Sequence, residues 1–280
     1  MAGLTTFIWG TTMVSSKILL QEGLSPAEIL SCRFTLGYLF LWILYPRTHR
    51  IRSWRDELVF VGMGVCGGSL YFLTENTALA YTQATNVSLI CAMVPLITAI
   101  LSFFVLKEKL SRRFWVGSLI ACMGVSMVIL NGSFVLKLSP LGDLLALSAI
   151  CCWAVYCILV KQLKSNYNSL YVIRNVFFYG LLTLAPYFLY EPFDVPLEAF
   201  QRPVVWTNLL FLGLIASSLC YVMWNMSMSE LGVIKTNTYL YFTPLVTMAT
   251  ASFFISEQIT VFILMGAALI LFGLWVANRR

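Results

Sequence analysis

The sequence predicts an all-α integral membrane protein with ten transmembrane helices arranged as two inverted five-helix repeats. Three observations predict this fold. Of the 280 residues, 60% are hydrophobic and only 11% are charged, whereas an average soluble domain has about 25% charged residues. Charges, prolines and glycine clusters divide the chain into about ten segments of helical length. The third to fifth segments also resemble the eighth to tenth. A soluble enzyme, a disordered chain and a β-barrel are therefore excluded.

Each segment is long enough to cross a bilayer, which takes about 20 apolar residues in a helix. The predicted spans are residues 4–21, 26–45, 57–80, 84–106, 113–131, 140–161, 169–190, 205–228, 233–255 and 259–277. The connections are short, so no separate soluble domain is expected. The first span has no basic region before it and no small-residue cleavage site after it, so we expect it to remain in the mature protein.

Lysine and arginine mark one side of the predicted bundle. That side carries Arg47, Arg50, Arg52, Arg55, Lys107, Lys109, Arg112, Arg113, Lys161, Lys164, Arg279 and Arg280. The other side carries Lys17, Lys137 and Arg202 with the acids Glu191, Asp194 and Glu198. Because cytoplasmic loops are rich in basic residues, both termini are predicted to be cytoplasmic. We expect a multi-pass protein of a bacterial inner (plasma) membrane. The net charge of +6 is explained by the basic residues that set the orientation in the lipid bilayer, which is an expected partner. No nucleic-acid partner is expected.

The internal repeat is the most specific signal in the sequence. Six pairs of residues are each separated by 149 positions: Gly64 and Gly213, Asn76 and Asn225, Pro95 and Pro244, Glu108 and Glu257, Gly117 and Gly266, and Gly124 and Gly273. Earlier in the halves, Trp9 matches Trp153 at a spacing of 144, and Arg33 matches Arg174 at 141. Residues 1–131 and 140–280 are therefore predicted to be two copies of one five-helix unit.

The number of spans in each copy predicts how the two copies are related. Because five is odd, the second copy enters the membrane from the opposite side, and the repeats are inverted. Inverted repeats place equivalent helices around a site near mid-membrane, an arrangement that can open to either face. Transport by alternating access is the expected function.

The sequence resembles the drug/metabolite transporter superfamily, specifically the EamA family of ten-span carriers. The resemblance covers nearly the whole chain. It rests on Trp9-Gly10, Arg33-Phe34, the run from Asn76 to Ala80, Ala84, Pro95 and Glu108, with the echo at Asn225, Pro244 and Glu257. It implies a central cavity lined mainly by the first, third, fourth, sixth, eighth and ninth spans. It does not identify the substrate.

Two ionisable residues lie well inside predicted spans, where such groups are costly and often functional. Arg33 and Glu75 are at similar depth in the outer half of the membrane. One hypothesis is that they pair, or nearly pair, at the cavity, and that protonation of Glu75 is coupled to transport. The alternative is a static ion pair between two spans. In the second half Trp224 replaces Glu75, so Arg174 is expected to have an aromatic neighbour, unless the difference is noise in a diverged repeat.

Aromatic and polar residues of the central spans form the predicted substrate site. The candidates are Trp9, Thr12, Tyr71, Glu75, Asn76, Trp153, Tyr156, Tyr221, Trp224, Asn225 and Tyr239. An apolar pocket with a few polar anchors suits an amphipathic organic solute. The alternative for the aromatic residues is a membrane-interface belt. Pro95 and Pro244 interrupt helical hydrogen bonding near the middle of matching spans, as gating hinges or as permanent kinks.

The predicted function is secondary active transport, by alternating access, of a small organic metabolite that is amino acid-like or amphipathic, in the outward direction. The chain lacks a P-loop pattern and has His49 as its only histidine, so no catalytic residue, metal or cofactor is expected. The alternatives are a passive facilitator of the same fold and a polytopic lipid-modifying enzyme. The expected partner is a small-molecule substrate, and the carrier is expected to be a monomer or a homodimer.

Overall fold

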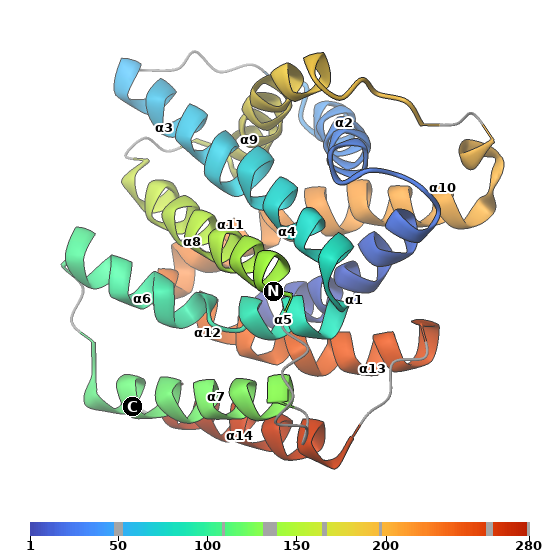
Figure 1. The fold of residues 1–280 in the computed structure, drawn as a ribbon. Coiled ribbons are helices and arrows are strands. Elements are labelled where there is room, and N and C mark those ends of the chain that lie inside the picture. The colour runs from blue at the N-terminus through green and yellow to red at the C-terminus, as the bar shows by residue number, and fades with distance from the viewer. Residues whose placement is uncertain are drawn as a thin grey trace.

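The computed structural model describes residues 1–47, 53–107, 110–130, 139–163, 167–195, 198–255 and 260–278. Within these ranges the regular elements are helices (Figure 1). The first half contains α1 (Ala2–Gln21), α2 (Pro26–Leu44), α3 (Trp54–Gly64), η1 (Val65–Ser69), α4 (Leu70–Tyr81), α5 (Ala84–Cys91), α6 (Val94–Val105) and α7 (Arg112–Leu130). The second half contains α8 (Pro140–Gln162), α9 (Ser169–Leu184), η2 (Ala185–Leu189), η3 (Ala199–Gln201), α10 (Pro203–Leu210), η4 (Phe211–Leu219), α11 (Cys220–Leu231), α12 (Val233–Thr238), η5 (Tyr239–Phe242), α13 (Thr243–Ile255) and α14 (Val261–Asn278).

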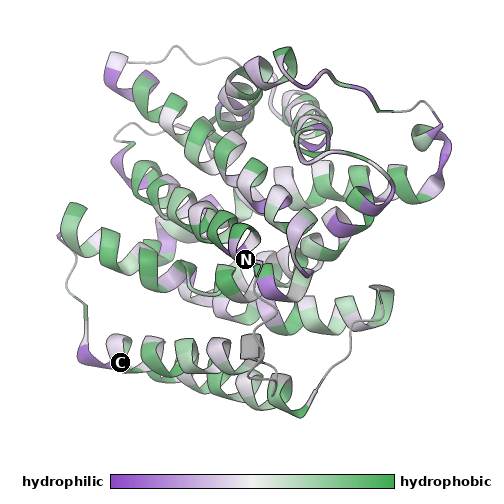
Figure 2. Cartoon of the chain, in the orientation of Figure 1, coloured by the Kyte–Doolittle hydropathy of each residue, from purple (hydrophilic) through white to green (hydrophobic). Residues whose placement is uncertain are grey.

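Consecutive segments join into ten helical rods in the described ranges, five from each half: α1, α2, α3–η1–α4, α5–α6, α7, α8, α9–η2, α10–η4–α11, α12–η5–α13 and α14. Five continuous helices there are long and apolar enough to cross a membrane: Pro26–Leu44, Trp54–Tyr81, Pro140–Gln162, Ser169–Leu189 and Pro203–Leu231. Val94–Val105 is a shorter apolar helix. Figure 2 shows apolar residues along the helices and hydrophilic residues gathered toward their ends and in the loops. The chain is an integral membrane protein with the predicted all-helical fold.

Local sequence signals set where several helices begin. Ser25 caps α2, because its hydroxyl accepts a hydrogen bond from the Glu28 amide while the Glu28 carboxylate accepts one from the Ser25 amide. This reciprocal capping box satisfies two amides that have no partner within the helix. Ser53 and Asn168 cap α3 and α9 with similar side-chain hydrogen bonds.

The predicted fourth and ninth spans are interrupted helices. Residues 84–106 form α5 and α6 with a break at residues 92–93, and residues 233–255 form α12, the 3-10 segment η5 and α13. A new helix starts just before each proline, with Pro95 in the first turn of α6 and Pro244 in that of α13. Proline lacks an amide hydrogen and clashes with the carbonyl four residues earlier, but it fits a first turn.

We expect Pro95→Ala to leave the fold and transport largely unchanged. In the first turn of α6 a backbone N–H at residue 95 has no partner within the helix, so replacing proline by alanine neither adds nor removes a helical hydrogen bond. The free energy of unfolding should therefore change by about 1 kcal/mol or less. Thermal unfolding of the detergent-solubilised variant and its solute flux test this. A large loss of flux with unchanged stability would instead support a gating hinge.

Residues related by the repeat meet at the seam between the halves. The rings of Trp9 and Trp153 lie 5.3 Å apart, and those of Phe34 and Phe177 lie 4.4 Å apart. α7 and α14, the fifth and tenth rods, pack side by side at one edge of the bundle (Figure 1). These contacts are the ones expected along a two-fold axis that relates the halves.

The second and seventh rods correct the register inferred from sequence. The N-caps of α2 and α9, Ser25 and Asn168, are 143 residues apart. Reciprocal contacts have the same spacing, because a Cβ on Gly37 would meet Phe177 and a Cβ on Gly180 would meet Phe34. Arg33 therefore corresponds to Val176, not to Arg174. Loops can differ in length between the two halves, so the spacing of 141 is acceptable from the sequence. It matches two arginines that are not equivalent in the structure.

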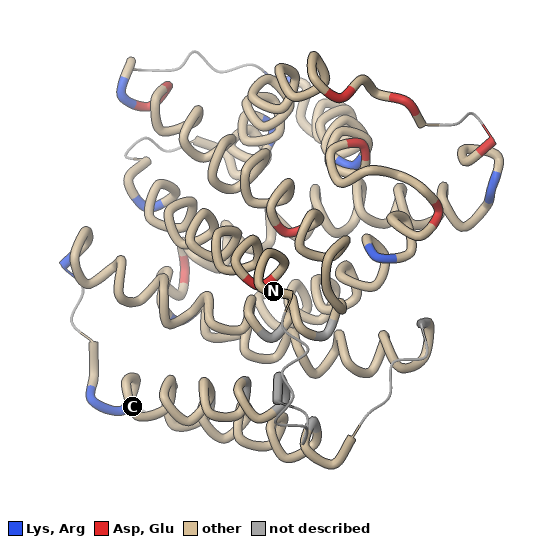
Figure 3. Tube along the Cα trace, in the orientation of Figure 1, with Lys and Arg blue, Asp and Glu red and all other residues tan. Residues whose placement is uncertain are grey.

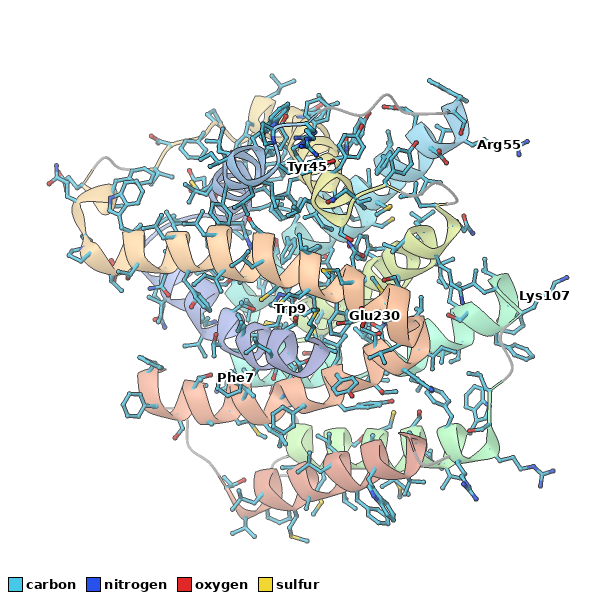
Figure 4. The ribbon with its side chains drawn as sticks, turned by 180° about the vertical axis from the view of Figure 1, so that it is seen from behind. Phe7, Trp9, Tyr45, Arg55, Lys107 and Glu230 are labelled. Atoms are coloured by element: carbon cyan, nitrogen blue, oxygen red, sulfur yellow. The ribbon has the colours of Figure 1, made fainter. Side chains whose placement is uncertain are left out.

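The charged residues divide between the two ends of the bundle. Figure 3 shows basic segments at the ends of α3, α6, α7 and α8 on one side, and acidic segments in the loop after α9 on the other. Arg55 and Lys107 lie at the same end in Figure 4. Several predicted residues lie outside the described ranges: Glu108, Glu257, His49, Arg50, Arg52, Lys109, Lys137, Lys164, Arg279 and Arg280.

Candidate functional site

A small cavity lies at the seam between the two halves. Its volume is about 40 Å³, which is room for about three water molecules at about 10–15 Å³ each. The lining residues are Trp9, Thr12, Met13, Arg33, Tyr71, Phe72, Glu75, Cys91, Val94, Trp153, Tyr221, Leu240 and Thr243. They come from all six spans that the resemblance implies, and Arg33 adds the second span.

Most of the lining residues form pairs related by the repeat. The pairs are Trp9 with Trp153, Phe72 with Tyr221, Cys91 with Leu240, and Val94 with Thr243. The other five, Thr12, Met13, Arg33, Tyr71 and Glu75, belong to the first half, and their described counterparts do not line the cavity. The cavity thus lies near the two-fold axis, with additional residues from the first half.

Two π-helical segments at equivalent positions accept hydrogen bonds from residues of the cavity wall. η1 and η4 interrupt the third and eighth rods, and π segments are frequent at functional sites. The Trp9 indole donates a hydrogen bond to the Ala216 carbonyl at 2.9 Å, and the Tyr221 hydroxyl donates to the Gly67 carbonyl at 2.8 Å. Gly67 and Ala216 are related by the 149-residue spacing. Each half therefore donates one aromatic hydrogen bond to the π segment of the other.

We expect Tyr221→Phe to lower the free energy of unfolding by about 1 kcal/mol, the usual loss for one buried hydrogen bond. Tyr221 is 1% exposed, so the Gly67 carbonyl would lose this donor without gaining bulk water. Thermal unfolding in detergent tests this, with the half-exposed Tyr239→Phe as the control. Equal unfolding midpoints in the two variants would contradict it.

The structure describes both charged residues of the cavity, Arg33 and Glu75. Both are buried, and they do not form a direct ion pair with each other. Arg33 is 2% exposed and Glu75 is 4% exposed. The Arg33 Nε donates to the Ser217 hydroxyl at 3.0 Å, and its guanidinium lies 4.1 Å from the centre of the Phe72 ring. The Tyr71 hydroxyl donates to the Glu75 carboxylate at 2.5 Å. Arg33 and Glu75 therefore share one cavity, each held by neutral neighbours.

A cluster of indole rings forms the wall nearest the axis. Trp9 lies 4.9 Å from Trp224 and contacts Trp153 edge-on, and Figure 4 places Trp9 in the middle of the bundle. The Trp153 indole donates to the Asn237 side-chain oxygen at 3.1 Å. Trp9 and Trp153 thus use different acceptors, so their hydrogen bonds break the symmetry of the repeat.

Four predicted site residues lie behind the lining. Asn76, Tyr156, Trp224 and Asn225 are buried, and the Tyr156 hydroxyl donates to the Asn225 side-chain oxygen at 3.3 Å. Tyr239 does not line this cavity and is 42% exposed. It belongs to the 3-10 segment η5, whose tighter turn places the next residue, Leu240, at the cavity.

Several lining residues were not among the sequence candidates: Met13, Phe72, Cys91, Val94, Leu240 and Thr243. Phe72 could have been found from the repeat, because it is the counterpart of the candidate Tyr221. Val94 and Thr243 each precede one of the matched prolines. The remaining apolar residues give no signal that separates a cavity wall from packed core.

Arg174 lies away from the cavity. Its guanidinium stacks 3.9 Å from the centre of the Trp42 ring and donates to the carbonyls of Tyr45 and Arg47 at 2.7 and 2.8 Å. It therefore satisfies carbonyls just beyond the C-terminus of α2, where a cation is favoured. The expected aromatic neighbour is present, but it is Trp42 and not Trp224, because Arg174 is not the counterpart of Arg33.

A family model and curated relatives match almost the whole chain. The model of the EamA-like transporter family matches residues 1–130 and 140–279. The uncharacterized transporter YyaM of Bacillus subtilis is 29% identical over 266 residues, which are 91% of this chain and 85% of that protein. The "Probable terminal-alkyne amino-acid exporter" of Streptantibioticus cattleyicolor is 25% identical over 281 residues, 99% of this chain and 92% of that protein.

A solved structure shares the fold. A crystal structure with a TM-score of 0.73 covers 98% of this chain and 98% of its own chain, at 19% sequence identity. At that identity the likeness concerns the fold alone.

Proposed function

Because the chain belongs to the EamA-like transporter family, we propose that it is a secondary active carrier that exports a small organic solute by alternating access. The solute is amino acid-like or amphipathic. The observation that carries the proposal is the cavity at the seam between the halves, lined by repeat-related pairs such as Trp9 and Trp153. A site near the symmetry axis can be exposed to either face by the same movement in opposite senses.

The size of the cavity supports a moving carrier rather than an open pore. A volume of about 40 Å³ holds about three water molecules, less than an organic metabolite needs. The halves must therefore move apart for a solute to bind or leave. Hydrogen bonds that cross between the halves, from Trp9 to Ala216 and from Tyr221 to Gly67, would rearrange in that movement.

The proposed location is the bacterial inner membrane, with both termini in the cytoplasm. The basic segments at one end of the bundle and the acidic segments at the other (Figure 3) support this orientation. The halves, residues 1–131 and 140–280, would then rock about the seam. Tagging each terminus and probing intact cells tests the orientation.

Glu75 is the proposed site of proton coupling. It combines burial, an acidic side chain and a position in the cavity wall, and intramembrane carboxylates are common in proton relays. A passive facilitator of the same fold is the alternative. A proton ionophore would stop accumulation by the coupled carrier and leave the flux of a facilitator unchanged.

Ligand-induced stabilisation followed by flux measurement tests the function. A solute that binds the folded protein raises its apparent unfolding temperature, so a panel of metabolites is screened against detergent-solubilised protein. Amino acids come first, since one relative is named as an exporter of an amino acid. Hits are then measured by counterflow in proteoliposomes. Stabilisation without flux of any hit would overturn the proposal.

A further inference from the structure

The cavity wall holds one positive and one negative charge that do not neutralise each other directly. Arg33 and Glu75 both line the cavity and are 2% and 4% exposed. Their partners among the described side chains are neutral: Ser217 and Phe72 for the guanidinium, and Tyr71 for the carboxylate. The two charges attract each other across the cavity, but without direct contact each buried charge is compensated only in part. Both side chains are thus available to a charged ligand.

Hydrogen-bonding groups remain open on both side chains. Arg33 donates through Nε to Ser217, and its two terminal nitrogens, which carry four of the five guanidinium N–H groups, make no hydrogen bond to the described residues. Glu75 accepts from Tyr71 through Oε1, and its Oε2 has no hydrogen-bond partner among them. The guanidinium can bind an oxyanion, and the carboxylate can bind an ammonium group.

We infer that this cavity selects solutes that carry one cationic and one anionic group, with Glu75 binding the cation and Arg33 the anion. The inference rests on the proposed transport function and names the charge class of its substrate. A solute with one charge would leave either Arg33 or Glu75 uncompensated. A zwitterion compensates both without bringing net charge into the membrane.

The rest of the cavity fixes the orientation of the solute. The charged residues lie on α2 and α4, whereas Val94, Leu240 and Thr243 lie on α6, η5 and α13. α2 and α13 lie on opposite sides of α1 in both Figure 1 and Figure 4. Once the halves have moved apart to admit a solute, its zwitterionic head faces α2 and α4, and its apolar side chain faces Val94 and Leu240, with the indoles of Trp9 and Trp153 between.

Matched probes that differ in charge alone test the inference. The probes are leucine, methionine and phenylalanine, each as the free amino acid, the cationic amide and the anionic N-acetyl derivative, at a pH at which the amide is protonated. For at least one side chain, the amino acid should bind the purified protein about 10-fold or more tightly than either derivative, which corresponds to losing one charge-assisted hydrogen bond. Thermal stabilisation and titration calorimetry give the affinities.

Two variants should change the preference in opposite directions. Glu75→Gln should favour the N-acetyl derivative over the amide, and Arg33→Gln should favour the amide over the N-acetyl derivative. A merely structural role would weaken all three forms alike. If a glutamine variant does not fold, Glu75→Asp and Arg33→Lys are used, and each should shift the preference in the same direction as its glutamine counterpart by a smaller factor.

The chain offers matched controls outside the cavity. Glu191 accepts a hydrogen bond from Tyr187, four residues earlier, at 2.5 Å, as Glu75 does from Tyr71, but it is exposed. Arg202 pairs with Glu22 on the surface. Glu191→Gln and Arg202→Gln should leave the wild-type preference intact.

The inference is overturned if the wild type binds an amide or an N-acetyl derivative as tightly as the amino acid for all three side chains, or if it binds none of the probes. Its failure is distinguishable from failure of the transport function. Counterflow of a singly charged or uncharged metabolite would refute zwitterion selection and leave the carrier intact. No flux of any metabolite would refute the carrier itself.

Discussion

Glu75→Gln should reduce solute flux by about 10- to 100-fold at neutral pH, the loss expected for one hydrogen bond to a charged group, and should abolish its dependence on pH. In the wild type the Glu75 carboxylate in the cavity wall is negative at higher pH and neutral once it takes a proton. Proton and cationic solute group then compete for the same oxygens. Wild-type binding should therefore weaken as the pH falls, whereas a glutamine amide does not titrate.

The measurement is flux in proteoliposomes across a pH series, for a solute found by the stabilisation screen. Glu191→Gln is the control, because it makes the same change in an exposed Tyr–Glu pair. The idea that Glu75 couples protons to transport is refuted if the variant keeps both the rate and the pH profile of the wild type. If the flux of Glu75→Gln no longer depends on pH but keeps the wild-type rate, Glu75 takes up the proton without binding the solute.

Gly117→Val should destabilise the fold more than any other substitution considered above. A Cβ on Gly117 would lie 2.5 Å from the Gly273 carbonyl oxygen and 2.4 Å from the Ala277 amide nitrogen. These are backbone atoms, which cannot move aside as a flexible side chain can. α7 and α14 would have to separate along their length, at a cost of about 3 kcal/mol, the upper part of the usual range for overpacking.

Thermal unfolding in detergent measures this effect. Gly3→Val is the matched control, because a Cβ on Gly3 meets no atom within 4 Å, and the free energy of unfolding should change by about 0.5 kcal/mol or less. Similar unfolding midpoints for the two variants would show that the close approach of α7 to α14 does not contribute to stability. The reciprocal change Gly273→Val should behave like Gly117→Val, since its Cβ would lie 2.5 Å from the Gly117 carbonyl oxygen.

The contact between α7 and α14 also shows what a glycine pattern can and cannot predict. The repeat relates Gly117 to Gly266 and Gly124 to Gly273, and glycines in membrane helices allow a neighbouring helix to approach closely. The structure shows that these helices approach each other within one chain. A glycine lacks the Cβ that keeps two helix backbones apart, but the sequence does not predict which helix will pack against it.

The sequence by itself determined the membrane class, the helical rods and the repeat. Each side chain prefers lipid or water according to its own polarity, so composition is enough to predict the membrane class. Helix caps such as Ser25 act within one turn, so they can also be read from the local sequence. The repeat also led to lining residues such as Trp9 and Trp153, because equivalent residues meet where a two-fold axis passes.

Only the tertiary structure decided the register of the second and seventh rods, the position of Pro95 and Pro244 in the first turns of new helices, and the surroundings of each charge. Arg33 and Arg174 are the same residue type near the start of matching helices, yet one faces the cavity and the other binds carbonyls beyond the end of α2. A shift of two residues turns a helical side chain by about 200°, so a small error of register reverses the face. Which side chains share a buried space depends on packing between segments that are more than a hundred residues apart, and local sequence carries no record of it.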